Sequence, residues 1–406
     1  MSKKDVRWRR MYLPKIENIK LSEKNIGLRA FAVGVLLLVA AIFLGRALTD
    51  FLNTEPGWQT VAVESDVVNV STEFNFSYDF SDYGGAASAA YKKLIIEYST
   101  ATEDAYRIFH EEVENLNSHV NEAVTVDPAL YNALSMIVAH DNRNLFLAPV
   151  YQAYNGIFLS GSSGEAVHYD PTKNEELGAE VAAMASYAND PEMIRLELLE
   201  NNQVRLCVSD AYLTFAGEHE LDRFVDMNWM TNAFVVDYLA ETMIAKGYTC
   251  GYIASYDGFT RNLDSRGNSY NFNLYDRRDF TVYPAGMLQY TEPVSIVFLR
   301  RYPLDSSDWL HYFEYADGSV TTVFIDPADG MSKASVENLV CYSENIGCAE
   351  ILLQAAPVFV ADSFDRSAVD ALSGISSVWF EGMNLCTNDA EAVIELNDQY
   401  GYSLKK

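Results

Sequence analysis

The sequence has few histidines and cysteines, and neither residue type is spaced as a set of metal ligands. Its six histidines form no H-E-x-x-H motif, and its five cysteines form no C-x-x-C pair. We interpret the histidines as surface or hydrogen-bonded residues and most of the cysteines as small buried apolar residues. A disulfide between Cys341 and Cys348, seven residues apart, is the alternative for that pair. The glycine-containing stretch 161–166 lacks the Gly-Lys-Ser/Thr of a phosphate-binding loop and is predicted to be a surface loop.

Positive charge is scarce outside the N-terminus. The chain holds 29 Lys and Arg against 57 Asp and Glu, which gives a formal net charge of −28. Residues 1–46 contain ten of the basic residues and three of the acidic ones, so the rest of the chain is more acidic still. Such an acidic surface repels nucleic acid and anionic lipid head groups. Nucleic acid is therefore excluded as a partner.

An apolar run near the N-terminus predicts a membrane anchor. Residues 30–45 read AFAVGVLLLVAAIFLG without a polar interruption. As a helix these sixteen residues extend about 24 Å, and flanking arginines can snorkel, so the segment 30–48 suffices to cross a bilayer. The excess of Lys and Arg before the run places the N-terminus in the cytoplasm. A cleaved signal peptide is the alternative.

The whole chain divides into four predicted parts. These are a cytoplasmic basic tail over 1–29, a transmembrane anchor over 30–48, a tether over 49–75 and an extracytoplasmic domain over 76–406. The last part is long enough to bury a sizeable core. The protein is thus expected at the cell membrane as a single-pass protein.

Hydrophobic periodicity in the large domain predicts a mixture of helices and strands, hence an α+β fold. Asp127-Pro128 is a typical helix start, with a capping residue followed by proline at the first helical position. Helices are predicted over 86–119, from Asp127-Pro128 onward, and over 175–187, 226–248, 343–356 and 366–372. Strands are predicted as a pair within 193–214 and over 250–254, 294–300, 358–360 and 378–381.

The segment 226–248, DMNWMTNAFVVDYLAETMIAKGY, carries a family resemblance. It resembles the D-L-G-G-I-A-K-G-Y-A-V-D helix of the ApbE family, the FAD:protein FMN transferases. Aligned without gaps, Asp226 and Asp237 match the two family aspartates. Asn232 stands where the family has its lysine, and Asn228-Trp229 stands where it has two glycines.

Two further segments resemble the same family. Ser255–Gly258 is similar to its N-l-G-G-[ND] turn, which faces the flavin nucleotide, although Ser-Tyr replaces Gly-Gly. VFIDPADGM is similar to H-I-I-D-P-x-T-G, keeping Asp326 and Gly330 but replacing the histidine with Val323. The resemblance extends over about residues 75–400, in order and with matching spacings. It implies an ApbE-like, T-fold-related α+β fold of mixed sheets with packed helices. The apolar run over 30–45 predicts one N-terminal transmembrane helix before this domain.

The resemblance implies FAD as the cofactor, but the residues at the family's magnesium-ligand positions argue against bound magnesium. The family's two magnesium ligands fall on Cys348 and Leu352, and neither supplies the oxygen that Mg²⁺ requires. No catalytic residue and no metal ligand is therefore assigned. The candidate cofactor-binding residues are Asp226, Asn232, Tyr256, Asp257 and Asp326.

Three hypotheses follow for the function. The leading one is a membrane-anchored, extracytoplasmic pseudoenzyme, a catalytically degenerate relative of the FMN transferases that binds a partner protein or a flavin nucleotide. The alternative is an active FAD:protein FMN transferase with a divergent site built on carboxylates such as Asp226 and Asp257. The third is a structural surface domain whose cleft is filled by Tyr256 and Trp229.

Overall fold

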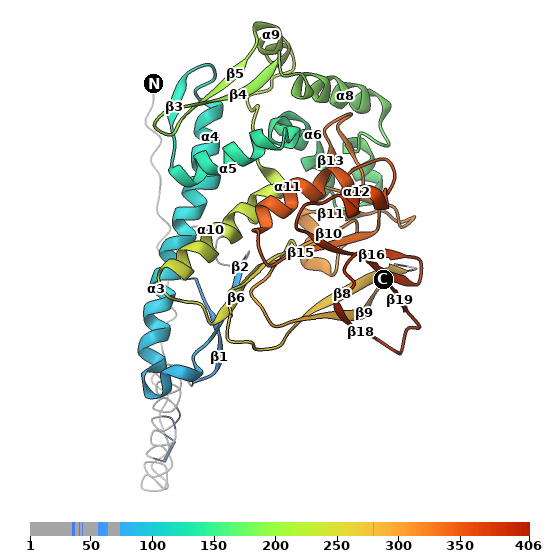
Figure 1. Cartoon of the computed structure of the whole chain (residues 1–406). Helices are drawn as coiled ribbons and strands as arrows, with labels where there is room; N and C mark the ends of the chain where they lie inside the picture. The colour runs from blue at the N-terminus through green and yellow to red at the C-terminus, as the bar shows by residue number, and fades with distance from the viewer. Residues whose placement is uncertain (1–34, 37–39, 41–42, 44–55, 64–73, 279) are drawn as a thin grey trace, which may run out of the picture. The chain divides into compact units, whose positions relative to one another are not determined.

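The computed structural model describes residues 35–36, 40, 43, 56–63, 74–278 and 280–406 (Figure 1). The chain separates into a unit up to Thr54 and a compact unit from Glu55 to Lys406. The predicted cytoplasmic tail and nearly all of the predicted anchor lie outside the described residues. Within the described ranges, the structure contains no helix long and apolar enough for a membrane span. The anchor over 30–48 stays a prediction.

A nine-stranded sheet forms the centre of the large unit (Figure 1). In spatial order it contains β1 (Trp58–Val61), β2 (Phe74–Asp79), β6 (Gly251–Ser255), β7 (Phe259–Asn262), β10 (Ser295–Arg300), β15 (Asn338–Ser343), β16 (Ser376–Glu381), β17 (Asn384–Thr387) and β19 (Ser403–Lys405). Its neighbouring strands are antiparallel except for the parallel pair β17 and β19. Because β1 pairs with β2, the sheet begins inside the segment 49–75 that was predicted to be a tether.

In the described part of the chain, four smaller sheets accompany the large one. They are formed by β18 (Val393–Leu396), β9 (Thr281–Tyr290) and β8 (Tyr270–Arg278); by β3 (Ala123–Thr125), β5 (Gln203–Val208) and β4 (Ile194–Leu199); by β11 (Tyr312–Glu314) and β12 (Val320–Thr322); and by β13 (Ile325–Asp326) and β14 (Met331–Ser332). The combination of packed helices with several separate sheets confirms the predicted α+β class.

Helical segments account for much of the remaining chain. They are η1 (Ser81–Ala86), α3 (Ala87–Tyr106), the π-helical turn η2 (Arg107–Glu111), α4 (Glu112–Asn117), α5 (Pro128–Ala139), η3 (Arg143–Phe146), α6 (Ala148–Phe158), α7 (Ser163–Ala166), η4 (Val167–Tyr169), α8 (Glu175–Asn189), α9 (Asp210–Glu218), η5 (Asn228–Met230), α10 (Thr231–Ala245), η6 (Ser306–Leu310), α11 (Cys348–Phe359) and α12 (Arg366–Asp370). The predicted helix over 86–119 is confirmed as the run from α3 to α4. The predicted cap is confirmed because the Asp127 side chain accepts a hydrogen bond from Ala129 N.

The two faces of the large sheet carry two separate cores. Along β10, Val297 and Leu299 pack into the core that also contains α10 and α11, whereas Ile296 and Phe298 pack into a second core with β8 and β9. This strand is therefore buried along its whole length. Figure 1 shows α10 and α11 running across one side of the sheet, with β8, β9 and β18 beyond its other side. The sheet thus supports the helix α10, from which the candidate site is built.

The central helix was predicted over 226–248, and the structure begins it later. Residues before Thr231 form the turn η5, and the helix ends at Ala245, with Gly247 following at φ +87°. Four of the five residues predicted for its apolar face are buried, namely Phe234, Val235, Leu239 and Met243. The fifth, Ile244, is exposed, because it falls beside the buried stripe in the last turn.

Several predicted boundaries were wrong for identifiable reasons. Residues 358–360, predicted as a strand, form the end of α11 and its cap, because the apolar run of that helix continues through Pro357. The second strand predicted within 193–214 ends at Val208, since Ser209 accepts a hydrogen bond from Tyr212 N and starts α9. The loop 161–166 contains the short helix α7.

All five cysteines are free, so the alternative of a Cys341–Cys348 disulfide is wrong. Cys341 Sγ lies 3.4 Å from Ser377 Oγ, and Cys348 Sγ donates to the Thr260 carbonyl at 3.3 Å. Both thiols are buried in the core, and burial raises the pKa of Cys341 to about 12. They behave as small apolar residues.

Candidate functional site

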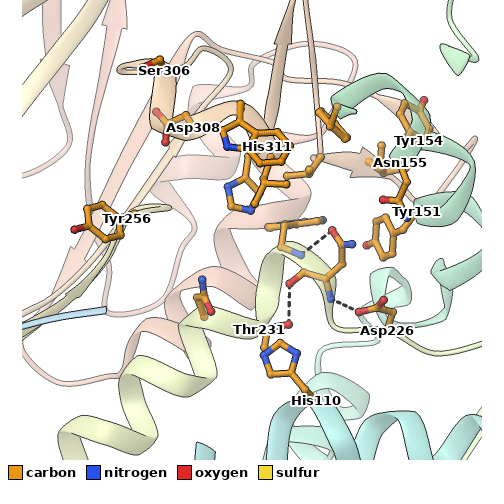
Figure 2. Close-up of a pocket in the computed structure, with 18 residues that line it drawn as sticks. His110, Tyr151, Tyr154, Asn155, Asp226, Thr231, Tyr256, Ser306, Asp308 and His311 are labelled. Atoms are coloured by element: carbon orange, nitrogen blue, oxygen red, sulfur yellow. Dashed lines mark hydrogen bonds between the residues drawn. The ribbon is translucent and has the colours of Figure 1, made fainter. Parts of the chain in front are cut away.

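A cavity of about 980 Å³ lies where the chain enters α10 (Figure 2). Residues of α6 form one wall, the turn η5 and the first residues of α10 form the floor, and the segment around η6 forms the opposite wall. Tyr256, in the turn between β6 and β7, lies at its edge. The lining residues are His110, Tyr151, Tyr154, Asn155, Phe158, Asp226, Asn228, Trp229, Thr231, Asn232, Tyr256, Ser306, Asp308, Trp309, Leu310, His311, Val323 and Ile325.

The floor of this cavity is a turn stabilised by its own side chains (Figure 2). Asp226 accepts a hydrogen bond from Asn228 N at 2.7 Å, Asn228 Oδ1 accepts from Trp229 N at 2.8 Å, and Thr231 Oγ1 donates to the Asn228 carbonyl at 2.7 Å. Asn228 has φ +43° and stands where the ApbE-type sequence has its first glycine. Asparagine is among the few residues other than glycine that adopt this left-handed conformation readily. Asn228 can therefore adopt this backbone conformation without being glycine.

Asp226 and His110 form the titratable part of the floor. Burial raises the pKa of the Asp226 carboxyl, and the Asn228 N–H, Arg223 and His110 oppose that shift. Desolvation lowers the pKa of the His110 imidazole, and the Asp226 carboxylate opposes it. His110 lies in the π-helical turn η2, and its ring stacks on Tyr106 with centroids 4.8 Å apart. Both shifts favour the uncharged forms of the two groups.

The structure brings the predicted residues Asn232 and Asp257 together from two separate segments. Asn232 Nδ2 donates to Asp257 Oδ2 at 3.0 Å, although only Asn232 lines the cavity. Tyr256, next to Asp257, is 66% exposed and faces solvent at the cavity edge. The turn depends on Gly258, with φ +117°, where a Cβ would lie 2.5 Å from the Phe298 carbonyl oxygen.

Asp326 lies away from the other candidates. It does not line the cavity; its neighbour Ile325 does. One of its oxygens accepts a hydrogen bond from Ala328 N, and the other forms an ion pair with Lys333 at 3.0 Å. Among the described contacts, Asp326 therefore acts as a turn former beside Pro327.

Several lining residues were missed by the sequence interpretation. The spacing of His110 and His311 matches no ligand motif and predicts surface or hydrogen-bonded residues, yet both line the cavity. Asp308 is buried and pairs with the fully buried Arg300, Nη2 to Oδ1, at 2.9 Å. The sequence places Arg300 at the end of a predicted strand. It gives no signal that Asp308, eight residues later, is the partner of this arginine. Trp309, the next residue, is half exposed at the cavity wall.

The positions that match the family's magnesium ligands lie in the core. Cys348 and Leu352 are both fully buried, and burial raises the pKa of the Cys348 thiol well above its usual value. The nearby Asp237 carboxylate already accepts hydrogen bonds from Cys348 N and Ala349 N, each at 2.9 Å, and pairs with Arg261 at 2.7 Å. Searched over its described ranges, the chain contains no group of three or more His, Cys, Asp or Glu side chains arranged to hold a metal ion. This donor set does not fit a hard divalent cation.

The fold and the cavity define an α+β domain with a ligand-sized pocket at the start of a buried helix. Solved structures of similar fold are ApbE flavin transferases. The ApbE protein of Thermotoga maritima aligns with a TM-score of 0.55 at 12% identity, over 84% of this chain and 98% of that one. The flavin transferase ApbE of Vibrio cholerae aligns with a TM-score of 0.54 at 12% identity, over 85% and 98%. The apo form of the flavinyl transferase ApbE of Pseudomonas stutzeri aligns with a TM-score of 0.53 at 13% identity, over 82% of this chain and 96% of that one.

These likenesses establish an ApbE-like fold for the described domain. No protein-family model matches the sequence, and no curated protein matches it either. The structural similarity extends over most of the chain at 12–13% sequence identity.

Proposed function

We propose that this chain is a catalytically degenerate ApbE-like domain, which binds a flavin-type ligand in the cavity at α10 and does not transfer FMN. The proposal rests on the residues that this chain has at the two positions where the family has its magnesium ligands, Cys348 and Leu352. Transfer of FMN from FAD requires charge neutralisation at the pyrophosphate, which a divalent ion supplies in metal-assisted chemistry. Here a buried thiol and a leucine occupy those positions, and the adjacent Asp237 is used by the backbone of α11 and by Arg261.

Other replaced groups support the same conclusion. Asn232, at the family's lysine position, is a neutral side chain that donates to Asp257. Val323, at the family's histidine position, is buried and cannot exchange a proton. Catalytic groups that work as a unit lose most of their rate with the first loss, so the combined losses leave little transfer activity.

The alternative of a divergent active transferase built on Asp226 and Asp257 has less support. Asp226 lines the cavity and is engaged by Asn228 N, whereas Asp257 is engaged by Asn232 and does not line it. The two carboxylates therefore do not converge on one ligand position. The third hypothesis, a filled cleft, does not agree with an open cavity of about 980 Å³ whose lining includes both Tyr256 and Trp229.

The proposal is tested by incubating the full-length protein with FAD and Mg²⁺ and measuring AMP release by chromatography. We expect no AMP above the level of a protein-free control, while the Vibrio cholerae flavin transferase assayed in parallel serves as the positive control. Release of AMP that depends on Mg²⁺ and on the protein would overturn the proposed loss of catalysis.

We also propose that residues 30–48 anchor the chain in the cell membrane, with the large domain on the extracytoplasmic side, where a partner protein can reach it. The apolar run and the basic residues before it support this orientation. Fractionation of cells should place the full-length protein in the membrane pellet, and external protease should digest the domain in intact spheroplasts. Recovery in the soluble cytoplasmic fraction would contradict the anchor.

A further inference from the structure

The lining of the cavity is short of positive charge. None of the described residues that line it is lysine or arginine, whereas Asp226 and Asp308 contribute two carboxyl groups. The guanidinium of Arg300 lies behind the wall, fully buried and paired with Asp308 at 2.9 Å, and it is not part of the lining. A phosphate group entering this cavity would meet two carboxyl groups and the imidazoles of His110 and His311, and no lysine or arginine side chain.

The start of a helix can compensate for missing cations, because its free N–H groups and its dipole attract anions. The turn η5 leads directly into α10, and the N–H groups of Asn228 and Trp229, the first of this helical run, are already used by the chain itself. The Asp226 carboxylate accepts from Asn228 N, and the Asn228 side chain accepts from Trp229 N. The positive end of the helix therefore faces an internal carboxylate rather than an open anion position.

Much of the remaining lining is aromatic, and it includes a buried donor, the indole N–H of Trp229. Tyr151, Tyr154, Phe158 and Trp229 line the interior, and Tyr256 and Trp309 lie at the edge, 66% and 50% exposed. Trp229 is only 4% exposed, and its indole Nε1–H has no acceptor in good hydrogen-bond geometry, although it lies near enough to the Tyr151 hydroxyl to oppose the rise in the pKa of that group. A buried donor without a partner is costly, and a ligand carbonyl or hydroxyl would satisfy it.

We propose that this cavity binds a flavin without phosphate groups, a planar uncharged ring system with a hydroxyl-bearing side chain, in preference to a flavin nucleotide. The ring stacks on the aromatic lining, and the Trp229 N–H donates to a ligand oxygen. The inference rests on the proposed function, since it names the ligand class for the same cavity.

Equilibrium dialysis of the full-length protein against riboflavin, FMN and FAD tests this preference directly. With EDTA present and at low salt, we expect riboflavin to bind at least about tenfold more tightly than FMN or FAD, a difference of about 1.4 kcal/mol. At high salt the difference should narrow, because screening weakens the repulsion between phosphate and the cavity carboxylates.

Two variants test separately the effect of the Asp226 charge and the effect of the Trp229 N–H donor. Asp226→Asn keeps an acceptor for Asn228 N and should raise the affinity for FMN relative to riboflavin by about threefold or more. Trp229→Phe keeps the ring and removes the donor, and it should weaken riboflavin binding by about fivefold to tenfold. Matched controls are Asp82→Asn, at an exposed position outside the lining, and Trp58→Phe on β1, which should alter neither affinity.

Tighter binding of FMN or FAD than of riboflavin would overturn the inference, and so would an absence of riboflavin binding. Circular dichroism of each variant shows whether the domain is folded. Failure of all three flavins to bind, or release of AMP, would contradict the proposed function, whereas binding of FMN or FAD without the preference for riboflavin would contradict this inference alone.

Discussion

Asp237 illustrates how one retained residue can serve a purely structural role. Its carboxylate accepts two backbone hydrogen bonds from the first residues of α11 and pairs with Arg261. Burial raises the pKa of this carboxyl, while Arg261 and the backbone N–H groups of Ala349 and Cys348 oppose the shift. The side chain therefore joins α10 to α11 and caps a helix whose own N-terminal residue, Gly347, offers no capping side chain.

Replacing Asp237 with alanine should lower the free energy of unfolding by about 3 kcal/mol, because it uncaps α11 and leaves Arg261 with a weaker partner. The measurement is urea unfolding followed by circular dichroism. Glu241→Ala is the matched control, since Glu241 pairs with the same arginine but is 66% exposed, and its loss should cost less than about 1 kcal/mol. Equal effects of the two substitutions would contradict the assigned role.

The connection between β7 and β8 is the clearest electrostatic element of the fold. Asp264 is fully buried there and accepts hydrogen bonds from Arg266, Tyr270 and Asn268. Arg266 also pairs with Asp79 at the end of β2 at 3.0 Å. Burial alone would raise the pKa of Asp264, but these hydrogen bonds hold it well below its usual value.

A carboxyl pKa that is lower in the folded state than in the unfolded state, where it is about 3.9, stabilises the protein at pH values above the unfolded-state pKa. This stabilisation is lost as the pH falls from there through the folded-state pKa. The wild type should therefore lose stability steeply below about pH 4, and Asp264→Asn should show a shallower acid slope together with a loss of about 2 kcal/mol at neutral pH. Chemical unfolding across this pH range measures both. Glu391→Gln, at an exposed position, should keep the wild-type slope.

Elements with strong local signals were predictable from the sequence, and long-range pairings were not. The cap at Asp127 and the run of helix from α3 to α4 followed from periodicity and capping residues. Residues 358–360 were misassigned because a short apolar run does not distinguish a strand from the end of a buried helix.

The candidate site was predictable only in part, for the same reason. The hydrogen bond between Asn232 and Asp257 joins two segments that had each been singled out by resemblance. His110 was missed because it reaches the cavity through the π-helical turn η2, and a regular helical period does not reveal such a turn. Asp326 was placed among the site residues by motif, yet its ion pair with Lys333 holds it outside the lining.

At the scale of the whole molecule, the charge of −28 should make stability depend on salt. Self-repulsion destabilises the compact state, and screening shortens from about 30 Å at 0.01 M salt to about 10 Å at 0.1 M. We expect the midpoint of thermal unfolding at neutral pH to rise by several degrees over this range. The same change in salt near pH 4.5, the isoelectric point, should have little effect. A midpoint that falls with salt at neutral pH would contradict this account.

The proposed function requires that the cavity at α10 of this ApbE-like fold lacks the metal chemistry of FMN transfer. The most direct measurement is the dissociation constant of FAD for the full-length protein, determined by equilibrium dialysis in Mg²⁺ and again in EDTA. The account predicts the same weak affinity in both conditions, within about twofold. An affinity at least about tenfold tighter in Mg²⁺ would show that the protein assembles a metal–pyrophosphate site, and would contradict the account.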